Sequence, residues 1–251
     1  MPATGAPVRV QPDGAVTTVV LSRPDALNAI TRDMLAELAS ALQAISVDPA
    51  VRVVVLTGEG RAFSAGVDLK SLGRRPLPGG AVGEFLDAPA QEVIGLLTTM
   101  PQVVVARVNG FCFTGALELV LACDLAVTAA EATWGDTHAK WGLRPTWGMS
   151  QRLVRAVGIS RARELSYTAR TFSGSEAAAW GLAARAVPLA DLDGAVAEIA
   201  DAVVANSAGS VAAYKDLFRQ ALDGGLGAGL AYEASTTFPI TDTEDRIASF
   251  R

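Results

Sequence analysis

Residues 109–124 have the sequence Asn109-Gly-Phe-Cys-Phe-Thr-Gly-Ala-Leu-Glu-Leu-Val-Leu-Ala-Cys-Asp124, and they directly follow the apolar run Val103–Val108. A strand that passes through glycines into the start of a helix leaves backbone N–H groups without partners. Gly115 and Glu118 are three positions apart, so on a helix they share a face. We therefore expect a backbone donor beside a carboxylate at the end of a buried element, which is typical of a catalytic site.

Composition narrows the class of protein. The chain has 251 residues, of which 50% are apolar and 19% charged, as in a globular protein with a substantial core. A net charge of −5 argues against a non-specific nucleic-acid binder. The apolar runs are shorter than the roughly 20 residues of a membrane span, and the N-terminus lacks a signal-peptide pattern. We expect a cytoplasmic enzyme. Cys112 and Cys123 suggest buried apolar side chains rather than a disulfide framework or a metal site.

Apolar patterns predict an α/β arrangement over most of the chain. Short β-branched runs favour strands at Val16–Leu21, 51–57, 103–108 and 125–128. Thr31 is suited to cap a helix that carries Leu35, Leu38, Leu42 and Ile45 at the helical period. Residues 1–15, rich in Pro, Gly and Ala, predict a loose arm.

A second glycine-rich turn, Gly58–Lys70, follows another predicted strand. Its spacing is neither that of a dinucleotide fingerprint nor that of a phosphate-binding P-loop. Two glycine turns after two parallel strands can direct two N–H donors at a single point. That arrangement is what an oxyanion hole requires.

The remaining segments predict a change of structure along the chain. The Gly- and Pro-rich residues 73–90 are typical of a mobile excursion that covers a pocket, and a helix is expected over Gln91–Thr99. Further helices are predicted at 149–157, 161–167 and 175–181. From Asp191 onward the pattern is helical without strands. We therefore predict an α/β core over residues 1–190 and a helical region over 191–251.

Four motifs in order resemble the enoyl-CoA hydratase/isomerase (crotonase) superfamily. They are Arg23-Pro with Leu27-Asn-Ala; Ala62-Phe-Ser-Ala-Gly-Val-Asp-Leu-Lys70; Asn109-Gly with Gly115-Ala-Leu-Glu-Leu and Ala-Cys-Asp124; and Gly142, Pro145 and Gly148 before Gln151-Arg-Leu. The resemblance implies a spiral of repeated ββα units and a C-terminal helical region that forms a homotrimer or a dimer of trimers. It also implies an acyl-CoA thioester as substrate, with no separate cofactor and no metal.

The resemblance also assigns positions in the site. Two backbone N–H groups, those of Val67 and Gly115, would polarise the thioester carbonyl and stabilise an enolate oxygen. Contacts to the coenzyme fall on Ala26, Leu27, Ala65, Asp68 and Leu69. Trp147 lies in the loop that faces the acyl group in relatives and is expected to narrow the pocket to short or planar acyl groups.

Hydratases of the superfamily use two glutamates, and this chain departs from that pattern. Glu118 matches the first, whereas His138 stands at the second position. Imidazole gives and takes a proton near neutrality, so His138 is a candidate for the same work. Asp136 is a candidate to orient its ring. The alternatives are an acid that merely pairs with an arginine and a structural histidine. The superfamily's triple glycine is also altered here, to Thr114-Gly115-Ala116.

Three functions stay open from the sequence. The leading hypothesis is a hydratase-like lyase that adds water to a 2-enoyl-CoA. The absence of the second glutamate favours a different reaction on the same enolate, such as isomerisation, thioester hydrolysis or C–C bond cleavage. The altered glycines also allow an acyl-CoA-binding protein without catalytic activity.

Overall fold

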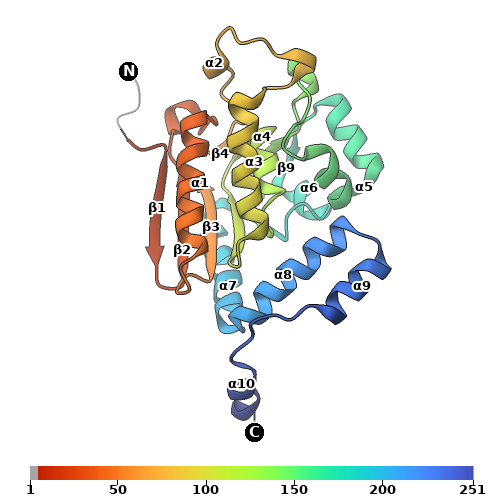
Figure 1. Ribbon diagram of the computed structural model, residues 1–251. Helices are drawn as coiled ribbons and strands as arrows, with labels where there is room; N and C mark the ends of the chain where they lie inside the picture. The colour runs from red at the N-terminus through yellow and green to blue at the C-terminus, as the bar shows by residue number, and fades with distance from the viewer. Residues whose placement is uncertain (1–4, 251) are drawn as a thin grey trace.

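The computed structural model describes residues 5–250 and contains two sheets (Figure 1). The larger has the order β1-β2-β3-β5-β7-β10, with bounds Val8–Asp13, Val16–Leu21, Val53–Gly58, Val103–Val108, Leu125–Ala129 and Arg185–Val187. Within this sheet β2, β3, β5, β7 and β10 are parallel, and β1 pairs antiparallel with β2. All six residues of β3 are buried, as its continuous β-branched run predicts.

The smaller sheet has the order β4-β6-β8-β9, with bounds Ala62–Ser64, Phe111–Phe113, Thr133–Gly135 and Phe172–Ser173. β4, β6 and β8 are parallel, and β9 is antiparallel to β8. Each of the long strands β3, β5 and β7 passes into one of these short strands and then into helical structure. The predicted spiral of ββα units is therefore confirmed.

Helices cover the sheets and complete the core. α1 (Arg32–Ser46) packs against α3 (Glu84–Thr99) in front of the larger sheet (Figure 1). The Thr31 side chain caps α1 by accepting from the Met34 N–H, and Leu35, Leu38 and Leu42 are fully buried, as predicted. The other helices before residue 190 are α2 (Leu69–Leu72), α4 (Gly115–Val120), α5 (Met149–Thr168) and α6 (Gly174–Ala179).

The C-terminal region is helical, as the sequence predicts. It contains α7 (Leu192–Ala205), α8 (Ala208–Asp223), α9 (Leu226–Ser235) and α10 (Thr243–Ser249). α7 packs against β5 and β7, and Asp193 at its start pairs with Arg107 of β5 at 2.6 Å. The structure thus identifies a partner for an arginine in an otherwise apolar strand. The division at residue 190 stays a prediction.

Two predicted loops are wrong in part. Within the expected N-terminal arm, Val8–Asp13 forms β1, because it pairs with the edge of β2 that β3 does not occupy. Residues 1–4 lie outside the described residues. The expected excursion over 73–90 ends at Gly83, because α3 begins at Glu84 and includes Pro89. Pro89 is the sixth residue of α3, so it removes one N–H that would otherwise donate within the helix.

One helix prediction is confirmed and another needs correction. The two helices expected at 149–157 and 161–167 form the two parts of α5, which are separated by a break in the dihedral angles at Gly158 (φ 74°, ψ 160°). The helix expected at 175–181 begins earlier, because Ser173 and Glu176 form a reciprocal capping box. Both cysteine thiols are free; Cys112 is buried, as expected, whereas Cys123 is only partly buried. Within residues 5–250, no helix is both long enough and apolar enough to cross a bilayer.

Candidate active site

The parallel strands of the smaller sheet bring the predicted site residues together. β4, β6 and β8 end at the same edge, where the chain leads respectively to Val67, to Gly115 and Glu118, and to His138. Val67, Glu118 and His138 line a single cavity of about 120 Å³, together with Trp147, Ala65 and Leu69. Residues that are up to 82 positions apart in the chain, from Ala65 to Trp147, therefore share one small chamber.

Glu118 is a buried acid with its two oxygens in different surroundings. Its side chain projects from α4 and is 2% exposed. Oε1 accepts from the backbone N–H groups of Trp147 and Met149, both at 3.0 Å. Oε2 faces the His138 ring, 3.7 Å from Nε2. Burial raises the pKa of Glu118, while nearby His138 and the two N–H groups oppose that rise. One oxygen of the carboxyl is thus anchored by the backbone, and the other faces His138.

His138 lies between two carboxylates. Its Nδ1 is 2.7 Å from Asp136 Oδ1, and its Nε2 is the nitrogen that faces Glu118. Asp136 is buried, and its Oδ2 accepts from the Ser166 hydroxyl at 2.7 Å. Burial alone would raise the pKa of Asp136, but hydrogen bonds from His138 and Ser166 hold it below its ordinary value. A hydrogen-bonded chain thus runs from Ser166 through Asp136 to His138, whose Nε2 faces Glu118 Oε2 across 3.7 Å.

The two predicted backbone donors are free within the described part of the chain. Val67 forms an isolated bridge with Ile30. The Ile30 N–H donates to the Gly66 carbonyl, and the Asp68 N–H donates to the Ile30 carbonyl, so the N–H of Val67 has no partner among the described residues. Gly115 is the first residue of α4, so its N–H has no acceptor within that helix. Thr114, just before it, has a φ of 53°, which an L-residue rarely adopts. Its hydroxyl contacts that of Thr137 at 2.5 Å and its N–H donates to Gly135, which hold this turn in place.

Trp147 forms a fixed wall of the cavity. Its ring lies so close to Gly115 that a Cβ there would be 2.7 Å from Cζ3. Its Nε1 donates to Asp87 Oδ1 of α3 at 2.9 Å, and the hydroxyl of Thr146 donates to the same oxygen at 2.7 Å. The indole is 3% exposed. Asp87 of α3 therefore fixes the Trp147 ring, which limits the chamber beside Gly115.

The five positions expected to contact a coenzyme lie on two segments of the chain, residues 26–27 and 65–69. The Ala65 N–H donates to the Leu27 carbonyl at 2.9 Å, so the two predicted segments lie side by side. Ala65 and Leu69 line the chamber, and Ala26 lines a neighbouring hollow of about 470 Å³. The Asp68 side chain instead caps α2 and pairs with Arg23 at 3.1 Å. The coenzyme contact expected of Asp68 stays a prediction.

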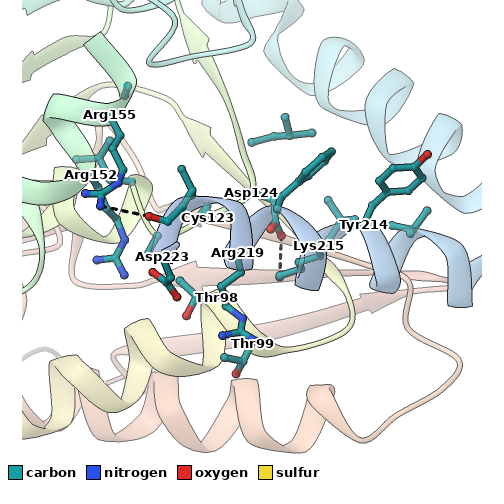
Figure 2. Close-up of a pocket in the computed structure, with 18 of the residues that line it drawn as sticks. Thr98, Thr99, Cys123, Asp124, Arg152, Arg155, Tyr214, Lys215, Arg219 and Asp223 are labelled. Carbon is teal, nitrogen blue, oxygen red and sulfur yellow. Dashed lines mark hydrogen bonds and ion pairs between the residues drawn. The ribbon is translucent and has the colours of Figure 1, made fainter. Parts of the chain in front are cut away.

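A larger hollow of about 760 Å³ lies elsewhere, beside α8 (Figure 2). Lys215 crosses it to Asp124 at 2.8 Å and also donates to two backbone carbonyls. Arg152 stands between this hollow and the chamber, because its guanidinium donates to the Trp147 carbonyl. Glu118, His138 and Val67 do not line the larger hollow. Glu118, His138 and Val67 identify the small chamber as the candidate active site; Gly115 is not among its lining residues and lies against the ring of Trp147, which is.

The sequence of this chain matches a model of the family described as Enoyl-CoA hydratase/isomerase over residues 11–250. The chain belongs to this family of enzymes. It is 33% identical over 220 residues to "Probable enoyl-CoA hydratase 1, peroxisomal" of Arabidopsis thaliana, which covers 88% of this chain and 81% of that protein.

Solved structures agree with the family assignment. An enoyl-CoA hydratase from Bacillus anthracis superposes with a TM-score of 0.86 at 32% identity, covering 91% of this chain and 88% of that one. A putative enoyl-CoA hydratase from Thermobifida fusca in complex with CoA superposes with a TM-score of 0.82 at 33% identity, and the match covers 98% of this chain and 94% of that one. The fold is therefore the crotonase fold, as the motifs predicted.

Three residues of the site carry no sequence signal that would have identified them. Asp87 lies on a helix that the sequence predicts to begin later, at Gln91. Ser166 is one polar position of an amphipathic helix, and Thr146 is one of several loop threonines. Each reaches the site only through tertiary packing, which local periodicity does not reveal.

Proposed function

We propose that this enzyme adds water to a short-chain 2-enoyl-CoA thioester. The observation that carries the proposal is the 3.7 Å separation of Glu118 Oε2 and His138 Nε2, in a chamber that the Val67 N–H also borders. That gap is too long for a direct hydrogen bond, and it suits two groups that hold one water between them. The coenzyme's thioester carbonyl would accept from the two free N–H groups.

The proposed reaction follows from these positions. A water held by Glu118 and His138 attacks Cβ of the enoyl group, and one of the two side chains takes its proton. The electrons of the double bond move to the carbonyl oxygen, and the resulting enolate is stabilised by the Val67 and Gly115 N–H groups. The enolate then collapses and takes a proton at Cα, which gives a 3-hydroxyacyl-CoA. These steps need no cofactor besides the coenzyme A of the substrate.

The size of the chamber supports a short acyl group. Its volume of about 120 Å³ equals roughly four times the ~30 Å³ that a water molecule occupies in the liquid. Trp147 and its Asp87 hydrogen bond occupy the side where a longer chain would extend. The neighbouring hollow at Ala26 also contains Arg32, which supplies positive charge for the coenzyme's phosphates.

Crotonyl-CoA is the direct test substrate. Purified protein should remove the absorbance of the conjugated thioester, and Glu118→Ala should lower kcat by ~10²–10⁴-fold, the usual contribution of a proton-transfer group. No turnover by the wild-type protein, or an unchanged rate in the variant, would contradict the proposal. Glu37→Ala, at an exposed position of α1 that lines neither hollow, is a matched control that should leave the rate unchanged.

A second reaction on the same enolate is favoured by one observation, the imidazole at the position of the family's second glutamate. A single buried carboxyl with a neighbouring base can also move a proton between carbons, which is isomerisation of a 3-enoyl-CoA. Mass spectrometry of products from a panel of 2-enoyl-, 3-enoyl- and saturated acyl-CoAs separates hydration, isomerisation and thioester hydrolysis. Rapid conversion of a 3-enoyl-CoA without hydration of crotonyl-CoA would replace the first proposal by the second.

A further inference from the structure

Both carboxylate oxygens of Asp136 are hydrogen-bonded, one to the proposed proton-transfer group His138 and the other to Ser166. Oδ1 lies 2.7 Å from His138 Nδ1 and 3.3 Å from the backbone N–H of the same residue. Oδ2 accepts from the Ser166 hydroxyl at 2.7 Å. Asp136 is 2% exposed and His138 is 8% exposed, so solvent does not compete for these contacts.

The ionisation of Asp136 decides which ring nitrogen carries hydrogen. Its pKa is held below the ordinary value, so near neutral pH the carboxyl is ionised and can only accept hydrogen bonds. The contact at 2.7 Å therefore requires a hydrogen on His138 Nδ1. In the neutral ring, the lone pair is then on Nε2, the nitrogen that faces Glu118 Oε2.

We propose that Asp136 is a positioning residue that fixes the Nδ1–H tautomer of His138, and that Ser166 holds Asp136 in the orientation this requires. The inference rests on the proposed function for its catalytic consequence: proton exchange with the bound water takes place only at Nε2. Without Asp136 the ring can rotate or place its hydrogen on Nε2, where it would oppose proton uptake from the water. The second carboxylate of related hydratases is thus replaced by a histidine–aspartate pair rather than by a histidine alone.

The chain offers an unusually direct test, because His138 is its only histidine. Protein labelled with ¹⁵N-histidine gives ring-nitrogen resonances from this residue alone, and their chemical shifts distinguish the two neutral tautomers. At a pH where the ring is neutral, the wild-type protein should show hydrogen on Nδ1 and a bare Nε2. Hydrogen on Nε2 in the wild-type protein would overturn the proposal without any kinetic measurement.

Variants test the positioning role. In Asp136→Asn the side-chain amide can donate to Nδ1, so the hydrogen should move to Nε2, and kcat on crotonyl-CoA should fall by ~10³–10⁴-fold with little change in KM. Ser166→Ala keeps the carboxylate and should show a mixture of tautomers with a smaller loss of kcat. Asp193→Asn, which changes an exposed aspartate on α7, is the matched control and should alter neither readout.

The two proposals fail in distinguishable ways. If the wild-type protein does not hydrate any enoyl-CoA, the tautomer of His138 still reports whether Asp136 positions it. If hydration is observed and Asp136→Asn keeps both the Nδ1–H tautomer and the wild-type kcat, the positioning role is wrong while the proposed function stands. Ser166→Ala provides the same decision where Asp136→Asn does not fold.

Discussion

At the scale of single residues, Glu118 combines burial with two different oxygen environments. Two backbone N–H groups hold Oε1, and Oε2 is left to face His138 across a gap that one water can bridge. An isolated acid in an apolar position would be costly, and the N–H groups offset only part of that cost. The protein therefore maintains a destabilising group at the place where we propose that it is needed for proton transfer.

Glu118→Gln should separate stability from activity. Burial raises the pKa of Glu118 above 4.5, so the folded protein holds the neutral acid more readily than the unfolded chain does. The cost of ionising it is absent below the unfolded pKa and grows as pH rises through the folded pKa. The variant should be more stable than wild type at pH 8, with the difference vanishing near pH 4, while kcat falls ~10²–10⁴-fold.

Urea denaturation at the two pH values, at matched protein concentration, measures this difference. A variant that is less stable than wild type at pH 8 would show that the carboxylate is net stabilising. In that case the hydrogen bonds and the His138 charge outweigh desolvation.

Trp147 should set the acyl-chain preference. Trp147→Ala removes the wall beside Gly115 but retains the backbone N–H that donates to Glu118 Oε1. The ratio of kcat/KM for octenoyl-CoA to that for crotonyl-CoA should rise at least ~10-fold, since each methylene that gains a pocket is worth ~1–3 kcal/mol. Steady-state assays on both substrates measure the ratio. Trp180→Ala, on α6's C-terminal side, is the control; an equal shift in both variants would contradict a specific role for Trp147.

At the scale of elements, glycine turns connect β3 to β4 and β5 to β6, and these two turns approach each other very closely. At Gly110 an added Cβ would be 2.1 Å from the Arg61 carbonyl oxygen, which lies in the turn leading to β4. Asn109 donates to the carbonyls of Gly58 and Gly60 in that same turn. The turn after β5 and the turn after β3 therefore support each other, and these two turns precede the segments that carry the proposed N–H donors.

Gly110→Ala should destabilise the fold strongly. The backbone oxygen that it would meet belongs to a turn and cannot move away without breaking the Asn109 hydrogen bonds, so we expect a loss of about 3 kcal/mol or more. Gly95→Ala in α3 is the matched control, because nothing lies within 4 Å of its added Cβ. It should stabilise the protein by ~0.5–1 kcal/mol. Thermal unfolding followed by circular dichroism distinguishes the two; equal Tm values would contradict this packing argument.

The sequence predicts the elements that are defined by their own periodicity and misses those that are defined by partners. The buried strands and α1 follow from β-branched runs and from leucines at the helical period. β1 was expected to be part of an arm, because only its pairing with β2 makes it a strand. The start of α3 was obscured by Gly83 and Pro89. The same limit applies to the site: motifs identify Glu118, His138 and the donors, whereas Asp87 and Ser166 are brought in by packing.

At the scale of the whole molecule, the C-terminal helices expose a concentration of large apolar side chains. Those more than half exposed on α8 and α9 are Tyr214, Phe218, Leu222, Leu226 and Leu230. Exposed apolar patches of this kind are typical of surfaces that contact another protein. The family resemblance also implies that the C-terminal helical region mediates assembly. On both grounds we propose that the chain forms a homotrimer or a dimer of trimers.

Light scattering should give a mass of three or six times the chain mass of 25.9 kDa. Phe218→Glu together with Leu226→Glu should lower the mass, because charges on a buried interface are costly. Val47→Glu, at the exposed C-terminal end of α1, is the control and should leave the mass unchanged. A wild-type mass equal to one chain would show that this surface does not mediate assembly.

The central claim is that Glu118 and His138 direct a water to Cβ of an enoyl thioester. It is tested most directly by incubating the wild-type protein with crotonyl-CoA in H₂¹⁸O and analysing the products by mass spectrometry. We predict 3-hydroxybutyryl-CoA with one ¹⁸O in its hydroxyl group, and its near absence with Glu118→Gln. Recovery of unchanged crotonyl-CoA, or of a free acid that carries ¹⁸O in its carboxylate, would contradict the claim.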